Sequence, residues 1–536
     1  MTGSRRQPGA GAALLILITF LAFLPALDGE FIWDDDAYVV DNTTLDDLSG
    51  LGRIWFEVGA TPQYYPVVFT TFWMESQIHD EKQVCGKDPF SFHLVNVCLH
   101  LLNAVLFFRV LRALGVPGAL VAAALFAVHP VTVESVAWIS ERKNVLSTLF
   151  FLGSVLASLR FFGVDRSGRN GRLLDYSLAL LLFLAALLSK SVTASLPAVL
   201  LLLIGWRRSR PTMRELLLLL PFFVAGTLMV FMTAWVEAKV VGAERVEMGL
   251  SLLDRVAVAG QAVWFYLGKL LAPVDLMFIY PRWDIHAAGS FRLVAPLLAV
   301  ALLIALYLAR RRLGVGPLVA ALYFGGTLLP ALGLVDFYPM IYSYVADHFQ
   351  YLAMFGPLAL FAALLARLPP RARWLVTGLL LLLLGWQTHE RCKVFHSSQE
   401  LFEDTLRKNP AAAMASINLA SIASRQQGDL DRSLTLLRAA EKVDPARVHY
   451  SVRAKVQYNI GRNLIDLGDY DGAITYFHAA QETWPNYWNT VYGIGFALAR
   501  KGDLEGAAAQ LRLMLQYHPD HEPSKVLLEH VLQEMK

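Results

Sequence analysis

Long apolar runs alternate with short polar loops over residues 1–395, whereas residues 396–536 contain no such run. A helix that crosses a bilayer needs roughly 20 mostly apolar residues in succession. The pattern therefore predicts an all-α fold, with a polytopic bundle of about eleven transmembrane helices over 1–395 and a separate helical domain over 396–536. The segments that reach or approach the required length are 11–27, 91–111, 115–129, 144–162, 173–189, 192–206, 215–236, 291–309, 316–334, 349–367 and 373–388.

Clusters of arginine stand in every second loop between these segments, as at 207–210, 310–312 and 367–373. Lys and Arg collect in cytoplasmic loops. If all the clusters lie inside, five exterior segments and the domain 396–536 lie on the periplasmic or luminal side. The five segments are 28–90, 129–143, 189–192, 237–290 and 335–348. The segment 254–272 would break this alternation if it crossed, and its mixture of charged and aromatic residues suits an interfacial or re-entrant helix.

A pattern of 34 residues is repeated in the domain 396–536. Each of three windows ends on a proline and carries a Gly-Asp pair near its middle: Pro445 with 428–429, Pro485 with 468–469, and Pro519 with 502–503. This period and these residue types are typical of tetratricopeptide repeats, in which two antiparallel helices join through a tight turn. The array predicts a concave surface for a protein or peptide segment. A purely scaffolding or dimerising role stays open as an alternative.

The composition argues against nucleic acid binding and against a cysteine metal site. The chain is 56% hydrophobic and 17% charged, and its net charge of +3 comes from arginines between apolar segments. No basic face tracks a phosphate backbone, so we expect no nucleic acid partner. The three cysteines have no metal-ligand spacing.

The loop after the first span opens with the sequence FIWDDDAYVV, which places Asp34, Asp35 and Asp36 in a row. Adjacent carboxylates at the carboxy-terminal end of a helix oppose the helix dipole and raise one another's pKa. They could act as a base, hold Mg²⁺ or Mn²⁺, or bind sugar hydroxyls. The simpler alternative is a solvated cap on the helix end.

Two further loops carry charged groups on the same predicted side. The stretch HPVTVESVAWISERKN runs from His129 through Glu134 to Arg142 and Lys143, and Lys190 stands in a turn between two apolar segments. Cations at the headgroup level suit a lipid phosphate, although snorkelling or turn-marking lysines would look the same. If 131–141 is one helix, Trp138 and Arg142 share a face.

Polar residues also stand in or beside two of the later segments. Asp347 and His348 open the segment at 349–367. Asn96, His100 and Asn103 share one face of the second span, where we expect hydrogen bonds within the bundle in preference to ligand contacts.

Taken together, these motifs resemble a known family. FIWDDDAYVVDN, FSFHLVNVCLHLLNAVLF, HPVTVESVAWISERKNVLSTLFFL and YVADHFQYLAMFG, followed by the repeats, are similar to the corresponding segments of the TMTC-like (transmembrane and tetratricopeptide) protein O-mannosyltransferases and their bacterial relatives. This chain departs from the family pattern at Asp36, at Lys143-Asn144, and at His348 where Arg is usual.

The resemblance implies a GT-C glycosyltransferase with many membrane-spanning helices, in a bacterial inner membrane. It implies transfer of mannose or a similar hexose from a polyprenyl-phosphate carrier to Ser or Thr of an exported protein, with inversion. Asp34 and Asp35 would be the catalytic pair. Residues that would bind the substrate or the lipid phosphate are His129, Glu134, Arg142, Lys143, Lys190, Asp347, His348 and Tyr351.

In this mechanism an acceptor hydroxyl loses its proton to Asp34 or Asp35 while it attacks the anomeric carbon, and the lipid phosphate leaves against the cations. A metal is not required, although Asp34, Asp35 and Asp36 could hold one. The alternatives are a membrane scaffold without catalysis and a surface-polysaccharide polymerase or ligase.

Overall fold

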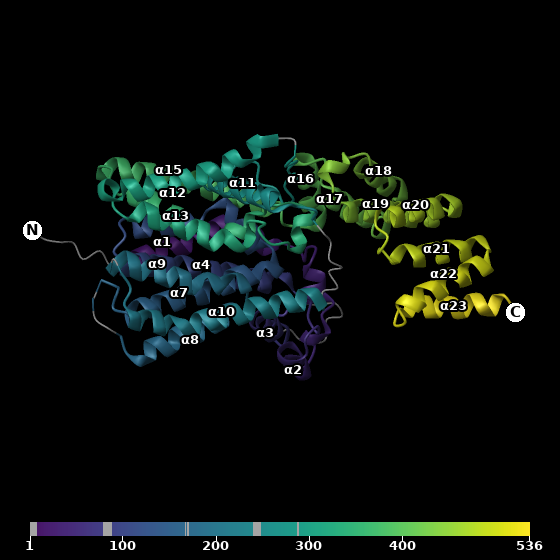
Figure 1. Ribbon diagram of the computed structural model, residues 1–536, viewed down its shortest axis with the longest axis horizontal. Coiled ribbons are helices and arrows are strands. Elements are labelled where there is room, and N and C mark those ends of the chain that lie inside the picture. Colours follow the sequence, from purple (N-terminus) through teal and green to yellow (C-terminus); the bar gives the residue numbers. More distant parts are fainter. Residues whose placement is uncertain are drawn as a thin grey trace, which may run out of the picture.

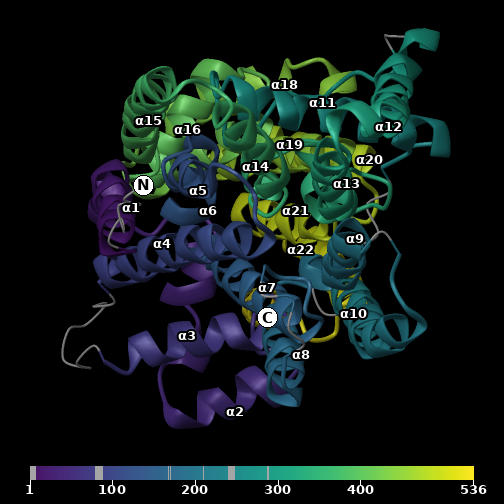
Figure 2. The same cartoon turned by 90° about the vertical axis from the view of Figure 1, so that its left-hand side faces the viewer.

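The computed structural model describes residues 8–78, 88–166, 168, 171–208, 210–239, 248–286 and 289–536, and all regular elements among them are helices. Figure 1 shows the long helices of the first part lying side by side, with the helices after residue 397 forming a tail at one end. In Figure 2, α2 and α3 lie together at one edge of the bundle. The helices of the first part are α1 Pro8–Phe23, α2 Leu48–Phe56, α3 Pro66–Ser76, α4 Pro89–Leu114, α5 Ala119–Ala127, α6 Val133–Ala137, α7 Arg142–Phe161, α8 Leu173–Leu187, α9 Leu196–Arg208, α10 Met213–Lys239, α11 Leu252–Leu271, α12 Val294–Leu313, α13 Gly316–Leu328, α14 Phe355–Leu365 and α15 Pro370–Lys393.

Five helices in the described residues are long and apolar enough to cross a membrane. The bent pair Ala119–Ala127 and Pro130–Ala137, whose halves meet at 53°, raises the number to six if it is one span. The several apolar helices indicate a multi-pass membrane protein. The five are Gly11–Asp28, Pro89–Leu114, Ile139–Phe161, Met213–Val236 and Phe291–Leu313.

This number is smaller than the eleven spans expected from the sequence. Length explains three of the differences: α8 has 15 residues, α13 has 13 and α14 has 11. At about 1.5 Å per residue a 15-residue helix is about 22 Å long, shorter than a hydrocarbon core of about 30 Å. Apolar runs that look continuous in the sequence here pass into 3₁₀ turns or irregular backbone at their ends. The helix α15 is long enough at 24 residues, but it carries charged residues at both ends and is not among the five. The helix α11, which covers the segment 254–272, is also outside the five.

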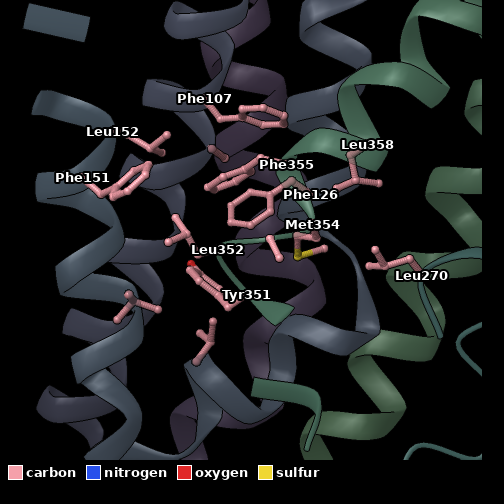
Figure 3. Packing of buried hydrophobic residues seen from close by; sticks show 14 of the residues in the cluster. Phe107, Phe126, Phe151, Leu152, Leu270, Tyr351, Leu352, Met354, Phe355 and Leu358 are labelled. Atoms are coloured by element: carbon pink, nitrogen blue, oxygen red, sulfur yellow. The ribbon is translucent and has the colours of Figure 1, made fainter. Parts of the chain in front are cut away.

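The core of the bundle is built from aromatic residues of α4, α5 and α14. The Phe355 ring lies 4.4 Å from that of Phe107 and 4.8 Å from that of Phe126, centre to centre. Figure 3 shows these three rings grouped together, with Leu352, Met354 and Tyr351 beside and below them. This packing fixes the segment 347–354 against α4 and α5.

The tail consists of a first helix, three helix pairs and a final helix, and the repeat pattern predicts the three pairs. The Gly-Asp pairs make the turns within the pairs: Gly428, Gly468 and Gly502 have φ of 68°, 82° and 91°, a conformation that favours glycine. The aspartates that follow cap α18, α20 and α22 by accepting a backbone N–H. The helices of the tail are α16 Ser398–Lys408, α17 Ala413–Arg425, α18 Leu430–Glu441, α19 Tyr450–Asp466, α20 Tyr470–Thr483, α21 Asn489–Lys501, α22 Leu504–Tyr517 and α23 Glu522–Glu534.

The tail is packed against the first part of the chain. Met340 and Ile341 in a 3₁₀ turn at Tyr338–Ile341 are buried in one hydrophobic cluster with Ala413 and Val452 of the tail. Asn409 Nδ2 also donates to the carbonyl of Ile279 at 3.1 Å. These contacts hold the repeats in a set position relative to the loops of the first part.

Candidate functional site

The chain turns sharply before the row of aspartates. Trp33 has a φ of 47°, which is unusual for a residue with a side chain, and its ring stacks on Trp138 with centroids 5.4 Å apart. A π-helical turn follows at Asp36–Val40. Strained residues and π turns are frequent at functional sites, and here they direct the three aspartates in different directions.

Asp35 is fully buried and holds two segments together. Its Oδ1 accepts the backbone N–H of Ser140 at 2.7 Å, and its Oδ2 accepts that of Ile32 at 3.0 Å. Burial raises the pKa of Asp35 to about 7, although these two hydrogen bonds favour the charged form. With both oxygens engaged, this carboxylate is suited to positioning the loop.

Asp34 is half-buried, and its carboxylate has no hydrogen-bond or ion-pair partner among the described residues. Burial raises its pKa, and the nearby Glu141 raises it further, while Lys143 and His348 lower it. A partly desolvated carboxylate that has no hydrogen-bond partner among the described residues is equipped to accept a proton. Asp36 is exposed.

Two lysines from different elements meet on one glutamate. Glu141 contacts Lys143 Nζ at 2.8 Å through one carboxylate oxygen and Lys190 Nζ at 3.2 Å through the other. Asn144 joins them, because its Oδ1 accepts from Lys190 Nζ at 2.7 Å and its Nδ2 donates to Glu141 at 2.6 Å. Burial lowers the pKa of Lys190 to about 8. Two lysines on one carboxylate leave a formal charge of +1 at this point.

Residues after Ser343 complete the same region. His348 Nδ1 lies 2.8 Å from Glu134 Oε1, and the His348 N–H donates to Glu134 Oε2 at 3.1 Å. The Tyr280 hydroxyl donates a hydrogen bond to Oδ1 of the neighbouring Asp347 at 2.8 Å. Burial, with a smaller effect of Glu134, raises the pKa of Asp347 to about 7.

The segment 130–141 is not a single helix. It consists of a 3₁₀ turn at Pro130–Thr132, the helix α6 and another 3₁₀ turn at Ile139–Glu141, with extended backbone at Trp138. The helical face expected to carry both Trp138 and Arg142 is therefore absent. The break instead presents the Ser140 N–H to Asp35.

Arg142 does not face this site. Its side chain is fully buried, pairs with Glu75 of α3, and donates to Asn96 Oδ1 at 2.8 Å and to the carbonyl of Phe92 at 2.9 Å. The guanidinium also lies 4.4 Å from the centre of the Phe72 ring. These partners hold the Arg142 guanidinium inside the protein. The structure therefore does not support the prediction that Arg142 contacts the carrier phosphate.

His129 and Tyr351 also lie inside the packing. His129 Nε2 is 3.1 Å from the carbonyl of Leu270. The Tyr351 hydroxyl lies 2.7 Å from His100 Nδ1 and accepts from Asn103 Nδ2 at 3.2 Å, and Figure 3 shows its ring within the aromatic core. Asn96, His100 and Asn103 thus bond within the bundle, as predicted, and Tyr351 is not positioned to contact a substrate.

The three aspartates do not converge on a cation site. The described residues contain no group of three or more His, Cys, Asp or Glu side chains that could hold a metal ion. Asp35 points into the protein, whereas Asp36 is exposed.

The sequence did not point to Glu141 and Asn144, which connect Lys143 and Lys190. Both belong to the run Glu141-Arg142-Lys143-Asn144, in which a carboxylate and an amide flank two cations. This mixture of charged and amide side chains was the available sign that the run forms a polar cluster. Which of the two cations faces the site depends on Glu75, far away in the sequence.

The sequence is similar to a repeat family and to a set of glycosyltransferases. The tetratricopeptide repeat family matches residues 395–447 and 458–522. A protein O-mannosyl-transferase of Caenorhabditis elegans is 23% identical over 508 residues, which cover 91% of this chain and 63% of that protein. Human protein O-mannosyl-transferase TMTC1 is 33% identical over 192 residues, and mouse TMTC3 is 29% identical over 164.

The chain is thus a distant homologue of the TMTC protein O-mannosyltransferases over most of its length, with tetratricopeptide repeats. It spans 63% of the length of the worm protein, and the alignments with the human and mouse proteins cover 20% and 17% of theirs. Among solved structures, the APC/C hetero-tetramer Cut9-Hcn1 gives a TM-score of 0.26 at 15% identity, covering 87% of this chain and 90% of that chain. A score this low does not establish a shared fold.

Proposed function

We propose that this chain is a GT-C-type membrane glycosyltransferase. It moves mannose or a similar hexose from a polyprenyl-phosphate carrier to Ser or Thr of an exported protein, on the exoplasmic face and with inversion. The distant homology to O-mannosyltransferases supports the class of reaction. The arginine clusters of the sequence support the side of the membrane.

One observation carries the proposal: Asp34 is a half-buried carboxylate with a raised pKa and no partner among the described side chains. As general base it takes the proton of the acceptor hydroxyl while the oxygen bonds to the anomeric carbon and the bond from that carbon to the phosphate oxygen breaks. A positioned base contributes typically about 10²–10⁴-fold in rate. Asp35 positions this base, because it fixes both the preceding Ile32 and the Ser140 turn.

The leaving phosphate needs cations that lie near Asp34. Lys143 and Lys190 are the cationic candidates, because Glu141 holds both and offsets only one of their two charges. His348, held by Glu134, can add a hydrogen bond. Ammonium groups aimed at the leaving oxygens stabilise the charge that develops on them. The phosphate is then contacted by residues of three separate segments.

The proposal is tested in cells that lack the gene and carry either the wild type or Asp34→Asn. Mass spectrometry of exported proteins reports hexose on Ser and Thr. We expect the modification to return with the wild type and to stay absent with Asp34→Asn at equal protein level. Full return with Asp34→Asn, or no hexose in any strain, would refute the proposal.

A further inference from the structure

A line of aromatic side chains leads from the candidate site toward the repeats. The His348 ring lies 4.3 Å from that of Phe349, centre to centre, and the Phe349 ring lies 5.5 Å from that of Phe337. Tyr338 follows directly in the chain and is exposed. Its hydroxyl is 3.0 Å from that of Tyr342. The line thus begins beside the residues that we assign to the phosphate.

The line continues onto the first helix of the second repeat. Lys455 Nζ donates to the Tyr338 hydroxyl at 3.3 Å. Tyr458 lies three residues further along α19 and therefore on the same face. Its ring is 5.3 Å from that of Tyr487, which stacks on Trp484 at 4.9 Å. We call Phe337, Tyr338, Tyr458, Tyr487 and Trp484 the aromatic surface.

Basic side chains border the aromatic surface on the repeats. Arg425 of α17 and Arg462 of α19 are exposed, and neither forms an ion pair among the described residues. Arg462 follows Tyr458 by four residues on α19 and therefore lies on the same face of the helix. Burial raises the pKa of Tyr458, whereas the charges of Arg462 and Arg425 lower it. With Lys455 they give the surface a positive border.

The two halves of the aromatic surface are held in a fixed relation. Met340 and Ile341, which lie between Tyr338 and Tyr342, are 0% and 2% exposed and pack with residues of the repeats. Movement of the loop away from α19 would expose this cluster, so the path from the site to the repeats is part of the folded structure.

We propose that the aromatic surface binds an extended, acidic segment of the acceptor polypeptide and brings a nearby Ser or Thr to Asp34. This inference rests on the proposed function. Tyrosine and tryptophan rings offer apolar contact and a polar end to a peptide backbone. Arginines pair with carboxylates in a fixed geometry, so the charge of the border selects Asp and Glu in the segment.

The experiment measures binding of fluorescent synthetic peptides to the full chain in nanodiscs, without a sugar donor. One peptide contains Ser and Thr among Asp and Glu, and the other has Lys in place of the acidic residues. We expect the acidic peptide to bind about tenfold more tightly. Arg462→Glu, and separately Lys455→Glu, should weaken its binding about tenfold, whereas the matched control Arg512→Glu on α22 should leave it unchanged. Thermal unfolding confirms that each variant is folded.

Equal binding of the two peptides would overturn the inference, as would equal losses in Arg462→Glu and Arg512→Glu. Sugar transfer is assayed separately in the same preparation. Charge-selective binding without any transfer would contradict the proposed function while leaving this surface as a peptide site. Transfer that proceeds without charge-selective binding would contradict this inference alone.

Discussion

Asp34 and Asp35 are neighbours of the same type, yet their surroundings give them different tasks. Asp35 has 0% exposure and accepts two backbone hydrogen bonds. Asp34 has no such bonds, and besides burial its pKa responds to Lys143, Glu141 and His348. A carboxylate with no exposed surface is poorly placed to reach the hydroxyl of a substrate. The pair inferred from the sequence therefore divides into a base and a positioning residue.

The pH dependence of transfer tests the assignment of the base. Asp34 accepts a proton only when ionised, and burial raises its pKa above the ordinary 3.8. We expect kcat/KM to increase with pH, with an acid limb at higher pH than an exposed aspartate would give. The measurement is a profile of initial rates between about pH 4 and pH 8. Undiminished transfer at the acid end of this range would contradict the assignment.

The position of Arg142 predicts a stability effect. Arg142→Ala removes the buried ion pair with Glu75 and the hydrogen bonds to Asn96 and Phe92. Breaking a buried ion pair in this way costs about 3–5 kcal/mol. Thermal unfolding in detergent should show a large loss for Arg142→Ala and substantial recovery when Arg142→Met is combined with Glu75→Leu.

The matched control for this experiment is Arg255→Ala. Arg255 pairs with Asp336 through side chains that are 18% and 38% exposed, and such a pair contributes below about 1 kcal/mol. If the two alanine variants unfold at the same temperature, the guanidinium of Arg142 is not buried as described.

At the scale of elements, the site depends on three separate breaks in helical structure. The 3₁₀ turn at Ile139–Glu141 supplies Glu141, the start of α7 supplies Lys143, and the turn between α8 and Ser191–Ser195 supplies Lys190. We expect Lys143→Ala or Lys190→Ala to lower kcat for transfer by about 10²-fold. Lys393→Ala, an exposed control, should have no effect. The measurement is kcat from steady-state kinetics. Wild-type kcat in both Lys143→Ala and Lys190→Ala would contradict the proposal that these lysines bind the phosphate.

The packing between repeat helices makes another prediction. A Cβ at Gly461 of α19 would lie 2.7 Å from the Phe477 ring of α20. Alanine is normally the better helix former by about 1 kcal/mol, but here the overlap should reverse the sign and destabilise the pair by about 1–3 kcal/mol. Hydrogen exchange of the α20 amides should become faster in Gly461→Ala. Gly325→Ala in α13, where a Cβ meets nothing within 4 Å, serves as the control, and slower exchange in Gly461→Ala would contradict the packing.

At the scale of the whole molecule, repeating patterns were predictable and side-chain directions were not. The Gly-Asp pairs located the turns of the repeats, because glycine permits φ above zero and aspartate caps the next helix. Apolar runs located the membrane helices but overestimated their number, since hydropathy does not reveal where a helix ends in a 3₁₀ turn. The partner of Arg142 is 67 residues away in the chain, and no local pattern could have assigned it.

The central claim is that Asp34 is the base of a sugar transfer, and the most direct test is a rate. The purified chain in nanodiscs is incubated with labelled polyprenyl-phosphate mannose and a Ser/Thr peptide, and the rate at which the label appears on the peptide is measured. We predict that Asp34→Asn loses about 10²–10⁴-fold in kcat, while the exposed neighbour Asp36→Asn keeps the wild-type rate. Transfer by Asp34→Asn at the wild-type rate would contradict the account.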